Sequence, residues 1–192
     1  MTSYEAGRIF GQTELETFLR SVDRHLSEPT RIIITGGGAA ALHNAESTTS
    51  DIDTYDGVSD ALRVAADMAG VETGLRIPVG RSFIGEYPWF FEDRLERRFP
   101  ELTQLEVFVL ERHDLALSKS LRGSDNDQRQ LTEMHLSAPF DFSTLVERFR
   151  TEMTHVTGNQ AEHRERFLAL IDLLFGELRR VTADRELRAK GR

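Results

Sequence analysis

The chain of 192 residues contains no cysteine. It therefore forms no disulfide, has no thiol nucleophile, and cannot hold zinc or an iron–sulfur cluster through thiolates. No apolar run reaches the roughly 18–20 residues that a membrane-spanning helix needs, and the first residues lack a signal-peptide pattern. We therefore expect a cytoplasmic protein without a membrane partner.

Lysine is also scarce, because 22 of the 24 basic residues are arginine. The two lysines are Lys119 and Lys190. In a chain that uses arginine for surface charge, an internal lysine such as Lys119 suggests a position where a compact ammonium group is wanted. The formal net charge of −8 argues against a broad surface that coats nucleic acid, but it is compatible with a local basic groove.

The pattern of apolar residues predicts strands and helices in alternation, followed by helices only. Thr13 and Ser59 are the expected N-caps of the first and third helices. This order predicts an α+β fold, with one domain over residues 1–138 and a helical segment over residues 139–192. The predicted helices are 11–27, 39–44, 60–69, 89–99, 113–122, 126–135, 143–156 and 160–188, and the predicted strands are 31–35, 50–55, 75–79 and 105–110.

The segment that follows the first strand has the residue types of a phosphate site. Glycines 36–38 lie between a buried strand and a helix start, where backbone can approach a ligand closely and free N–H groups favour an anion. Asp51 and Asp53 then lie two residues apart on a strand, so both carboxylates point to one face. Adjacent carboxylates repel each other, and a divalent cation such as Mg²⁺, shared with substrate phosphates, explains their pairing.

This arrangement resembles the signature of the polymerase-beta-type nucleotidyltransferase superfamily: Gly36-Gly37, a short helix, and then Thr49-Ser50-Asp51-Ile52-Asp53. The resemblance implies a mixed sheet flanked by helices, and a nucleoside triphosphate as substrate. It assigns nucleotide binding to Gly36, Gly37 and Ser50. It also assigns one or two magnesium ions to Asp51 and Asp53, with a third carboxylate expected on a neighbouring strand.

Later segments resemble a bacterial nucleotidyltransferase-like family of unknown function that is related to the abortive-infection type E toxins. That family has a hydrophobic strand, then Asp-Leu-x-x-Ser-Lys-Leu, a basic turn and an Arg-Asp-x-x-Asp helix. The matching segments here are 105–110, 114–120, Arg122-Gly123 and 126–130, and Trp89-Phe-Phe-Glu-Asp-Arg-Leu95 is also similar.

The resemblance to the toxins assigns catalytic roles to Asp51, Lys119 and Asp127. Asp53, as the second metal carboxylate, joins them as a predicted catalytic residue. Lys119 would neutralise phosphate charge, and Asp127 would orient Lys119 or the acceptor. Two positions depart from the Arg-Asp-x-x-Asp helix of the relatives, because Asn126 replaces the arginine and Gln130 replaces the second aspartate.

The third metal carboxylate is assigned to Glu106, the acidic residue inside a later predicted strand, where it would serve as metal ligand or general base. A solvent-exposed position at the sheet edge is the alternative for Glu106. Simpler interpretations also stand for the other residues: a solvated strand edge for Asp51 and Asp53, a surface lysine at 119, and a helix cap at Asp127.

These observations lead to one function hypothesis and two alternatives. The first is a Mg²⁺-dependent nucleotidyltransferase that acts on an unknown acceptor, such as RNA and in particular tRNA, within a toxin–antitoxin or phage-defence system with an antitoxin protein as partner. The second is a non-catalytic nucleotide-binding or interaction protein on the same fold. The third is a Rossmann-type dinucleotide binder, since residues 36–41 also fit G-x-G-x-x-A.

Overall fold

The structure is a computed structural model, and it describes residues 8–44, 46–82 and 85–189. The chain divides into two compact units. The first comprises Met1–Phe83 and Leu95–Leu110, and the second comprises Ile84–Arg94 and Glu111–Arg192. The boundary expected after residue 138 stays a prediction.

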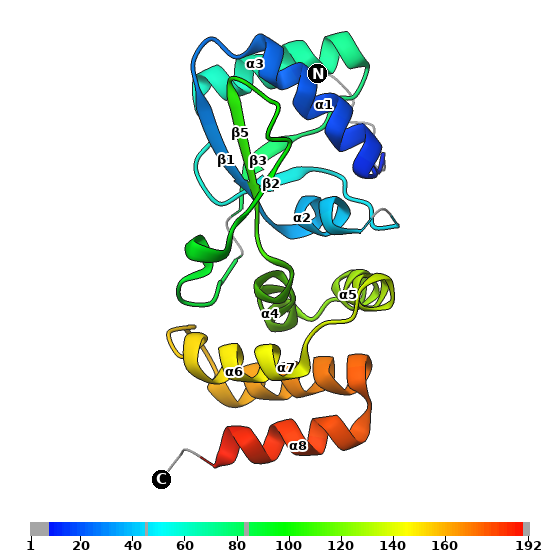
Figure 1. Cartoon of the computed structure of the whole chain (residues 1–192), viewed down its shortest axis with the longest axis vertical. Helices are drawn as coiled ribbons and strands as arrows, with labels where there is room; N and C mark the ends of the chain where they lie inside the picture. Colours follow the sequence, from blue (N-terminus) through cyan, green and yellow to red (C-terminus); the bar gives the residue numbers. More distant parts are fainter. Residues whose placement is uncertain (1–7, 45, 83–84, 190–192) are drawn as a thin grey trace. The chain divides into compact units, whose positions relative to one another are not determined.

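The first unit contains a five-stranded mixed sheet (Figure 1). Its order is β3-β2-β1-β5-β4, where β1 pairs in parallel with β5 and antiparallel with β2. The remaining pairs are parallel for β2 with β3 and antiparallel for β4 with β5. A doubly wound dinucleotide-binding sheet would be parallel, so this topology is not that of a Rossmann domain. The strands are β1 (Thr30–Ile34), β2 (Ile52–Thr54), β3 (Val79–Arg81), β4 (Glu96–Arg98) and β5 (Leu105–Val109).

Three helices accompany this sheet: α1 (Gln12–His25), α2 (Gly36–His43) and α3 (Asp60–Thr73). Helix α1 packs on α3 and also contacts β5, while α2 packs beside β2 (Figure 1). The apolar residues at helical spacing in α1 bury one face against the strands, as the sequence predicts. The core includes Leu15, Phe18, Leu19 and Val22 of α1, Ile32 and Ile34 of β1, Ile52 of β2, Leu62 and Ala65 of α3, and Leu105, Val107 and Val109 of β5.

The second unit is helical, and its helices α6, α7 and α8 pack against one another (Figure 1). Its elements are the 3₁₀ turn η1 (Phe91–Arg94) and the helices α4 (Arg112–Arg122), α5 (Asp125–Ser137), α6 (Phe142–Glu152), α7 (Gln160–Phe175) and α8 (Glu177–Arg188). None of the helices in the described ranges combines the length and apolar character that crossing a membrane requires.

A buried carboxylate ties η1 to α4 and α6. Asp114 is fully buried, and the Arg94 guanidinium donates to both of its oxygens at 2.8 and 3.1 Å. Arg148 donates to the same carboxylate at 2.8 Å, and Arg94 also donates to Glu152 at 2.7 Å. Since a buried charge requires partners, this network fixes the path of the segment that begins at Trp89.

The α+β fold with a helical C-terminal part is confirmed, whereas two predicted helices are wrong in extent. Residues 89–99 form η1 and the edge strand β4, with positive φ at Phe90 (65°) and Phe99 (52°) around them. The long helix predicted over 160–188 is broken at Gly176, where φ is +82°. The continuous apolar periodicity conceals that break.

Helix starts are set by their caps. Ser59 caps α3, as predicted, since its Oγ accepts from the Leu62 amide at 3.1 Å. The predicted cap Thr13 is wrong because α1 begins one residue earlier, at Gln12, with Gly11 as N-cap. The Glu14 carboxylate accepts from the Gly11 amide at 3.1 Å, which completes that helix start.

One side chain of α1 organises the entry into β5. Oδ1 of Asp23 accepts from three consecutive backbone amides, those of Thr103, Gln104 and Leu105, at 3.0, 2.7 and 2.7 Å. Asp23 is buried, so water does not replace these bonds readily. The carboxylate therefore holds the loop before β5 against α1.

We predict that Asp23→Ala lowers the free energy of unfolding by about 2–4 kcal/mol, because it leaves buried amides without an acceptor. Asp23→Asn keeps one carbonyl oxygen at this position and is expected to lose less. Urea denaturation of the three proteins measures the difference. Equal losses for the two variants would contradict this role of the Asp23 oxygen.

Candidate active site

The glycine turn after β1 packs directly on the segment that carries the two aspartates. Gly36 has φ of +59°, in the left-handed region that favours glycine. A Cβ added to Gly36 would lie 2.7 Å from Oδ2 of Asp53, and one added to Gly37 would lie 2.5 Å from Oγ1 of Thr49. Real Cβ atoms do not approach so closely, and the short contacts therefore account for both glycines.

Asp51 is held by a neighbouring hydroxyl. The Thr49 hydroxyl lies 3.0 Å from the Asp51 carbonyl oxygen and 3.3 Å from its Oδ1. Thr49 is buried, and its backbone pairs with Phe10 in an antiparallel bridge. Ser50 is exposed beside them, while Asp51 and Asp53 are half-buried. Both aspartates therefore lie against the same glycine turn, Asp53 directly and Asp51 through Thr49.

Helix α2 begins at this turn without a side-chain cap. Its N-cap residue Thr35 makes no capping hydrogen bond, and its hydroxyl lies 3.5 Å from the Asp53 carbonyl oxygen instead. The first amides of a helix carry partial positive charge and bind phosphate readily. The site thus places a helix start without a side-chain cap beside a carboxylate pair. Side-chain caps close the starts of α3 to α7 by Ser59, Glu111, Ser124, Asp141 and Asn159.

The structure does not bring Glu106 to this turn. In the parallel pairing of β5 with β1, Glu106 lies opposite Arg31. On the other side of β1, the Thr35 amide donates to the Asp53 carbonyl oxygen, so Asp53 lies opposite Thr35. That offset of four residues corresponds to about 13 Å along a strand. The Glu106 side chain is exposed, and its carboxylate lies 3.6 Å from the Arg97 guanidinium.

The second unit places the other predicted residues in one buried cluster. Nζ of Lys119 donates to Oδ1 of Asp127 at 2.8 Å and to Oε1 of Gln130 at 2.7 Å. Lys119 is 3% exposed, Asp127 1% and Gln130 0%. The compact ammonium that the arginine bias suggested at position 119 is therefore an internal one, shared between α4 and α5.

Asp127 has further partners in the same cluster. The Arg122 guanidinium donates to both of its oxygens at 2.7 and 2.6 Å, and the Ser124 hydroxyl donates to Oδ2 at 2.6 Å. Although burial alone would raise the pKa of Asp127, these donors together with Lys119 hold its pKa well below the usual range. Asp127 is therefore a carboxylate at any physiological pH, and Ser124 is the cap of α5.

Gln130 takes the place of a carboxylate that the resemblance led us to expect. Its amide oxygen accepts from Lys119, so the ammonium keeps an acceptor there without a second negative charge. Asn126, the other departure, accepts from Arg129 at 2.7 Å on the exposed side of α5. The substitutions at 126 and 130 are thus accommodated by local hydrogen bonds.

A family model described as "Nucleotidyltransferase of unknown function (DUF6036)" matches residues 13–172. The chain belongs to this family. The match covers the glycine turn, the aspartate pair and the Lys119 cluster, and it confirms the predicted resemblance at the level of a nucleotidyltransferase-like family. Comparisons with curated proteins and with solved structures give no match.

The carboxylate pair fits a magnesium ion that is shared with a nucleotide. Within the described ranges there is no group of three or more His, Cys, Asp or Glu side chains suited to a metal ion. Mg²⁺ does not require such a group, because it is usually bound by one or two carboxylates with water and substrate phosphates as its other ligands. The half-buried Asp51 and Asp53 beside an uncapped helix start meet that requirement.

Thr49 is the residue that sequence reasoning missed. It lies inside the quoted motif, but the sequence does not reveal that its hydroxyl contacts both Asp51 and the glycine turn. A threonine two residues before the first aspartate was a usable signal, since short hydroxyl side chains commonly bond to backbone two residues on.

We predict that Lys119→Met lowers the free energy of unfolding by about 2–4 kcal/mol, because it removes one partner of a buried ion pair while Arg122 still holds Asp127. Arg122→Met, at the half-exposed end of the same cluster, should cost about 1 kcal/mol or less. Urea denaturation tests both. If the two variants are equally stable, Lys119 does not have the buried structural role described.

Proposed function

We propose that the protein is a Mg²⁺-dependent nucleotidyltransferase that moves a nucleotide from a nucleoside triphosphate to an acceptor. The observation that carries this proposal is the contact between the glycine turn and the aspartate pair, 2.7 Å from a Cβ position on Gly36 to Oδ2 of Asp53. Membership of a nucleotidyltransferase family supports it. A phosphate on the first amides of α2 would lie next to these carboxylates.

In this proposal the chain's own residues position the triphosphate and the metal. The amides of Gly36 and Gly37 bind phosphate oxygens, and the exposed Ser50 hydroxyl donates to the nucleotide. Asp51 and Asp53 hold the metal, with Thr49 fixing the direction of the Asp51 carboxylate. A bound magnesium ion would supply charge that stabilises the acceptor oxygen that attacks the α-phosphorus and the pyrophosphate that leaves from it.

Lys119 and Asp127 act as positioning residues in this proposal. Their charges are buried and bonded to each other, so they hold α4 and α5 together. The proposal assigns the metal to Asp51 and Asp53 without Glu106, whose carboxylate lies beside Arg97.

We propose RNA, in particular tRNA, as the acceptor, and a relation to the abortive-infection type E toxins with an antitoxin as partner protein. The support is the motif resemblance together with the arginines of α8. Of these, Arg185 and Arg179 are exposed, and the Arg179 guanidinium lies 4.8 Å from the centre of the Phe142 ring. Arginine side chains of this kind contact phosphates and stack on bases.

We predict that Asp51→Asn and Asp53→Asn each lower nucleotide transfer by several orders of magnitude, because the metal loses a charged ligand. The assay follows consumption of labelled nucleoside triphosphates with Mg²⁺ and total tRNA. Binding of Mn²⁺, followed by electron paramagnetic resonance, reports the metal site without any need for turnover.

The matched control is Asp60→Asn, whose carboxylate is 97% exposed at the start of α3 and should leave both readouts unchanged. The metal assignment would be contradicted if Asp51→Asn and Asp53→Asn both transferred nucleotide and bound Mn²⁺ as well as the wild-type protein does. Glu106→Gln is expected to retain activity, since the structure separates Glu106 from the pair.

A non-catalytic nucleotide-binding protein is the second candidate. It is favoured by the burial of Lys119 and Asp127 and by Gln130 in place of a carboxylate. Calorimetric titration with nucleoside triphosphates, with and without Mg²⁺, separates the two candidates when it is paired with the transfer assay. Metal-dependent nucleotide binding without transfer to RNA, protein or small-molecule acceptors would favour the non-catalytic nucleotide-binding protein.

We predict that the double variant Arg179→Gln/Arg185→Gln binds tRNA more weakly than wild type. The slope of log affinity against log salt concentration should become shallower by about one unit for each phosphate that the variant can no longer neutralise. Arg63→Gln on α3 is the matched control. If the α8 variant has the same tRNA affinity and the same salt slope as wild type, the proposal that α8 binds RNA is wrong.

A further inference from the structure

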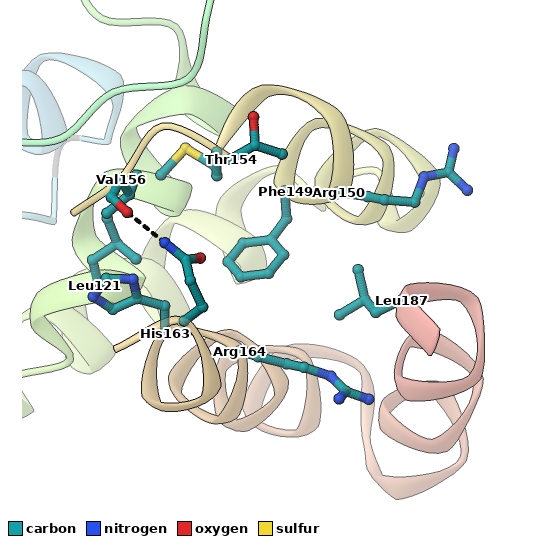
Figure 2. Close-up of a pocket in the computed structure, with 10 residues that line it drawn as sticks. Leu121, Phe149, Arg150, Thr154, Val156, His163, Arg164 and Leu187 are labelled. Carbon is teal, nitrogen blue, oxygen red and sulfur yellow. Dashed lines mark hydrogen bonds between the residues drawn. The ribbon is translucent and has the colours of Figure 1, made fainter. Parts of the chain in front are cut away.

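The helical unit contains a cavity of about 200 Å³ that the proposed nucleotidyl transfer does not use. Figure 2 shows its lining, which comes from α6, α7, α8, the end of α4 and the loop after α6. The cavity is smaller than the roughly 300–1,000 Å³ of pockets for drug-sized ligands. A ligand here would therefore be about the size of a single ring with one substituent.

One part of the lining is apolar. The Phe149 ring borders the cavity and stacks on Phe167 with 4.1 Å between ring centres, so its position is fixed. Met153 and Val156 are buried beside it, and Leu187 comes from α8. Such a lining offers water few hydrogen bonds and suits an apolar body.

The other part consists of nitrogen atoms without partners. Nε of Arg150, Nδ1 of His163 and Nε of Arg164 are buried, and in the described part of the chain none of them has a hydrogen-bond partner. All three residues line this cavity. Buried polar atoms are rarely left unpaired, and the two arginine Nε–H groups can only donate. Their place around one cavity therefore indicates that an acceptor belongs there.

The basic residues of the lining favour an acceptor with negative charge. The cavity is lined by two arginines and a histidine, and by no aspartate or glutamate among the described residues. Arg164 is paired with Asp184, whereas Arg150 has no ion pair with a described residue. In Figure 2 the Arg150 and Arg164 side chains extend in the same direction on one side of Phe149, and His163 lies on the other side.

The backbone supports this arrangement around His163. Gly158 has φ of +108°, and a Cβ at this position would lie 3.3 Å from Cε1 of the His163 ring. The loop between α6 and α7 therefore packs on the imidazole. Gln160 at the start of α7 donates to the Val156 carbonyl oxygen at 2.5 Å, which fixes the loop further.

We propose that this cavity is a binding site for a small amphipathic anion, a carboxylate or phosphate monoester on an apolar body such as one aromatic ring. The oxyanion pairs with Arg150, and the ring lies against Phe149 and Leu187. Arginine is suited to this role because its planar N–H groups match the two oxygens of a carboxylate or phosphate.

The experiment titrates the full-length protein with benzoate and with phenyl phosphate, and compares benzamide as the neutral analogue of benzoate. Calorimetry measures affinity, and the imidazole proton resonances in NMR report contact with His163. We expect saturable binding of at least one of the two anions, no binding of benzamide, and a shift of the His163 resonances. Binding of benzoate indicates a carboxylate ligand, and binding of phenyl phosphate indicates a phosphate ligand.

Arg150→Met should weaken anion binding about tenfold or more, because it removes the unpaired guanidinium and keeps most of the side-chain stem. Arg129→Met, at an exposed position of α5 that does not line the cavity, is the matched control and should bind as wild type does. Circular dichroism and thermal unfolding without ligand confirm that both variants are folded.

Binding of benzamide equal to that of benzoate, unchanged anion affinity in Arg150→Met, or no binding of either anion would overturn the proposal. These readouts involve no nucleotide and no magnesium. Their failure would therefore leave the proposed nucleotidyl transfer untouched, and the failure of that transfer would leave this site untouched.

Discussion

The candidate site depends on one close approach, that of the glycine turn after β1 to the segment that carries Asp51 and Asp53. Gly36 has a positive φ, and its Cα faces the Asp53 carboxylate at a distance that excludes a Cβ. The antiparallel pairing of β1 with β2 places Ile34 level with Thr54, so the turn that follows β1 lies beside Asp53. The start of α2 has no side-chain cap, so a helix start of the kind that favours anions in general and a carboxylate pair share one location.

Buried charge organises the helical unit in a different way. Asp114 is held by two arginines, and Asp127 is held by Lys119 and Arg122. Asp114 joins segments that lie apart in the sequence, whereas Asp127 joins the consecutive helices α4 and α5. Removal of a partner of either carboxylate would leave an uncompensated charge. A residue that belongs to a motif can therefore stabilise the packing of a unit without contacting the reacting atoms.

Local signals in the sequence were sufficient for the glycine turn, the aspartate pair and the strands β1 and β5. A turn rich in glycine and a β-branched run each act within a few residues, so the sequence alone reveals them. The edge strand β4 was missed because its three residues are charged and spaced as in a helix; an edge strand tolerates charge because one side of it faces solvent. Gly176 was missed because apolar residues continue on both sides of it.

Tertiary relations explain the remaining differences. Glu106 has the right residue type on the right kind of strand, but only the register with β1 shows that it lies away from Asp53. The contact of the Thr49 hydroxyl with Gly37, and the unpaired nitrogens around the helical cavity, depend on segments that are separated in the sequence. Neither feature leaves a periodic trace in the sequence.

A crystal structure with Mg²⁺ and a non-hydrolysable nucleoside triphosphate analogue tests the central claim most directly. We predict phosphate oxygens on the amides of Gly36 and Gly37, and a metal ion between those phosphates and the carboxylates of Asp51 and Asp53. A nucleotide bound elsewhere, or a metal bound without either aspartate, would contradict the account.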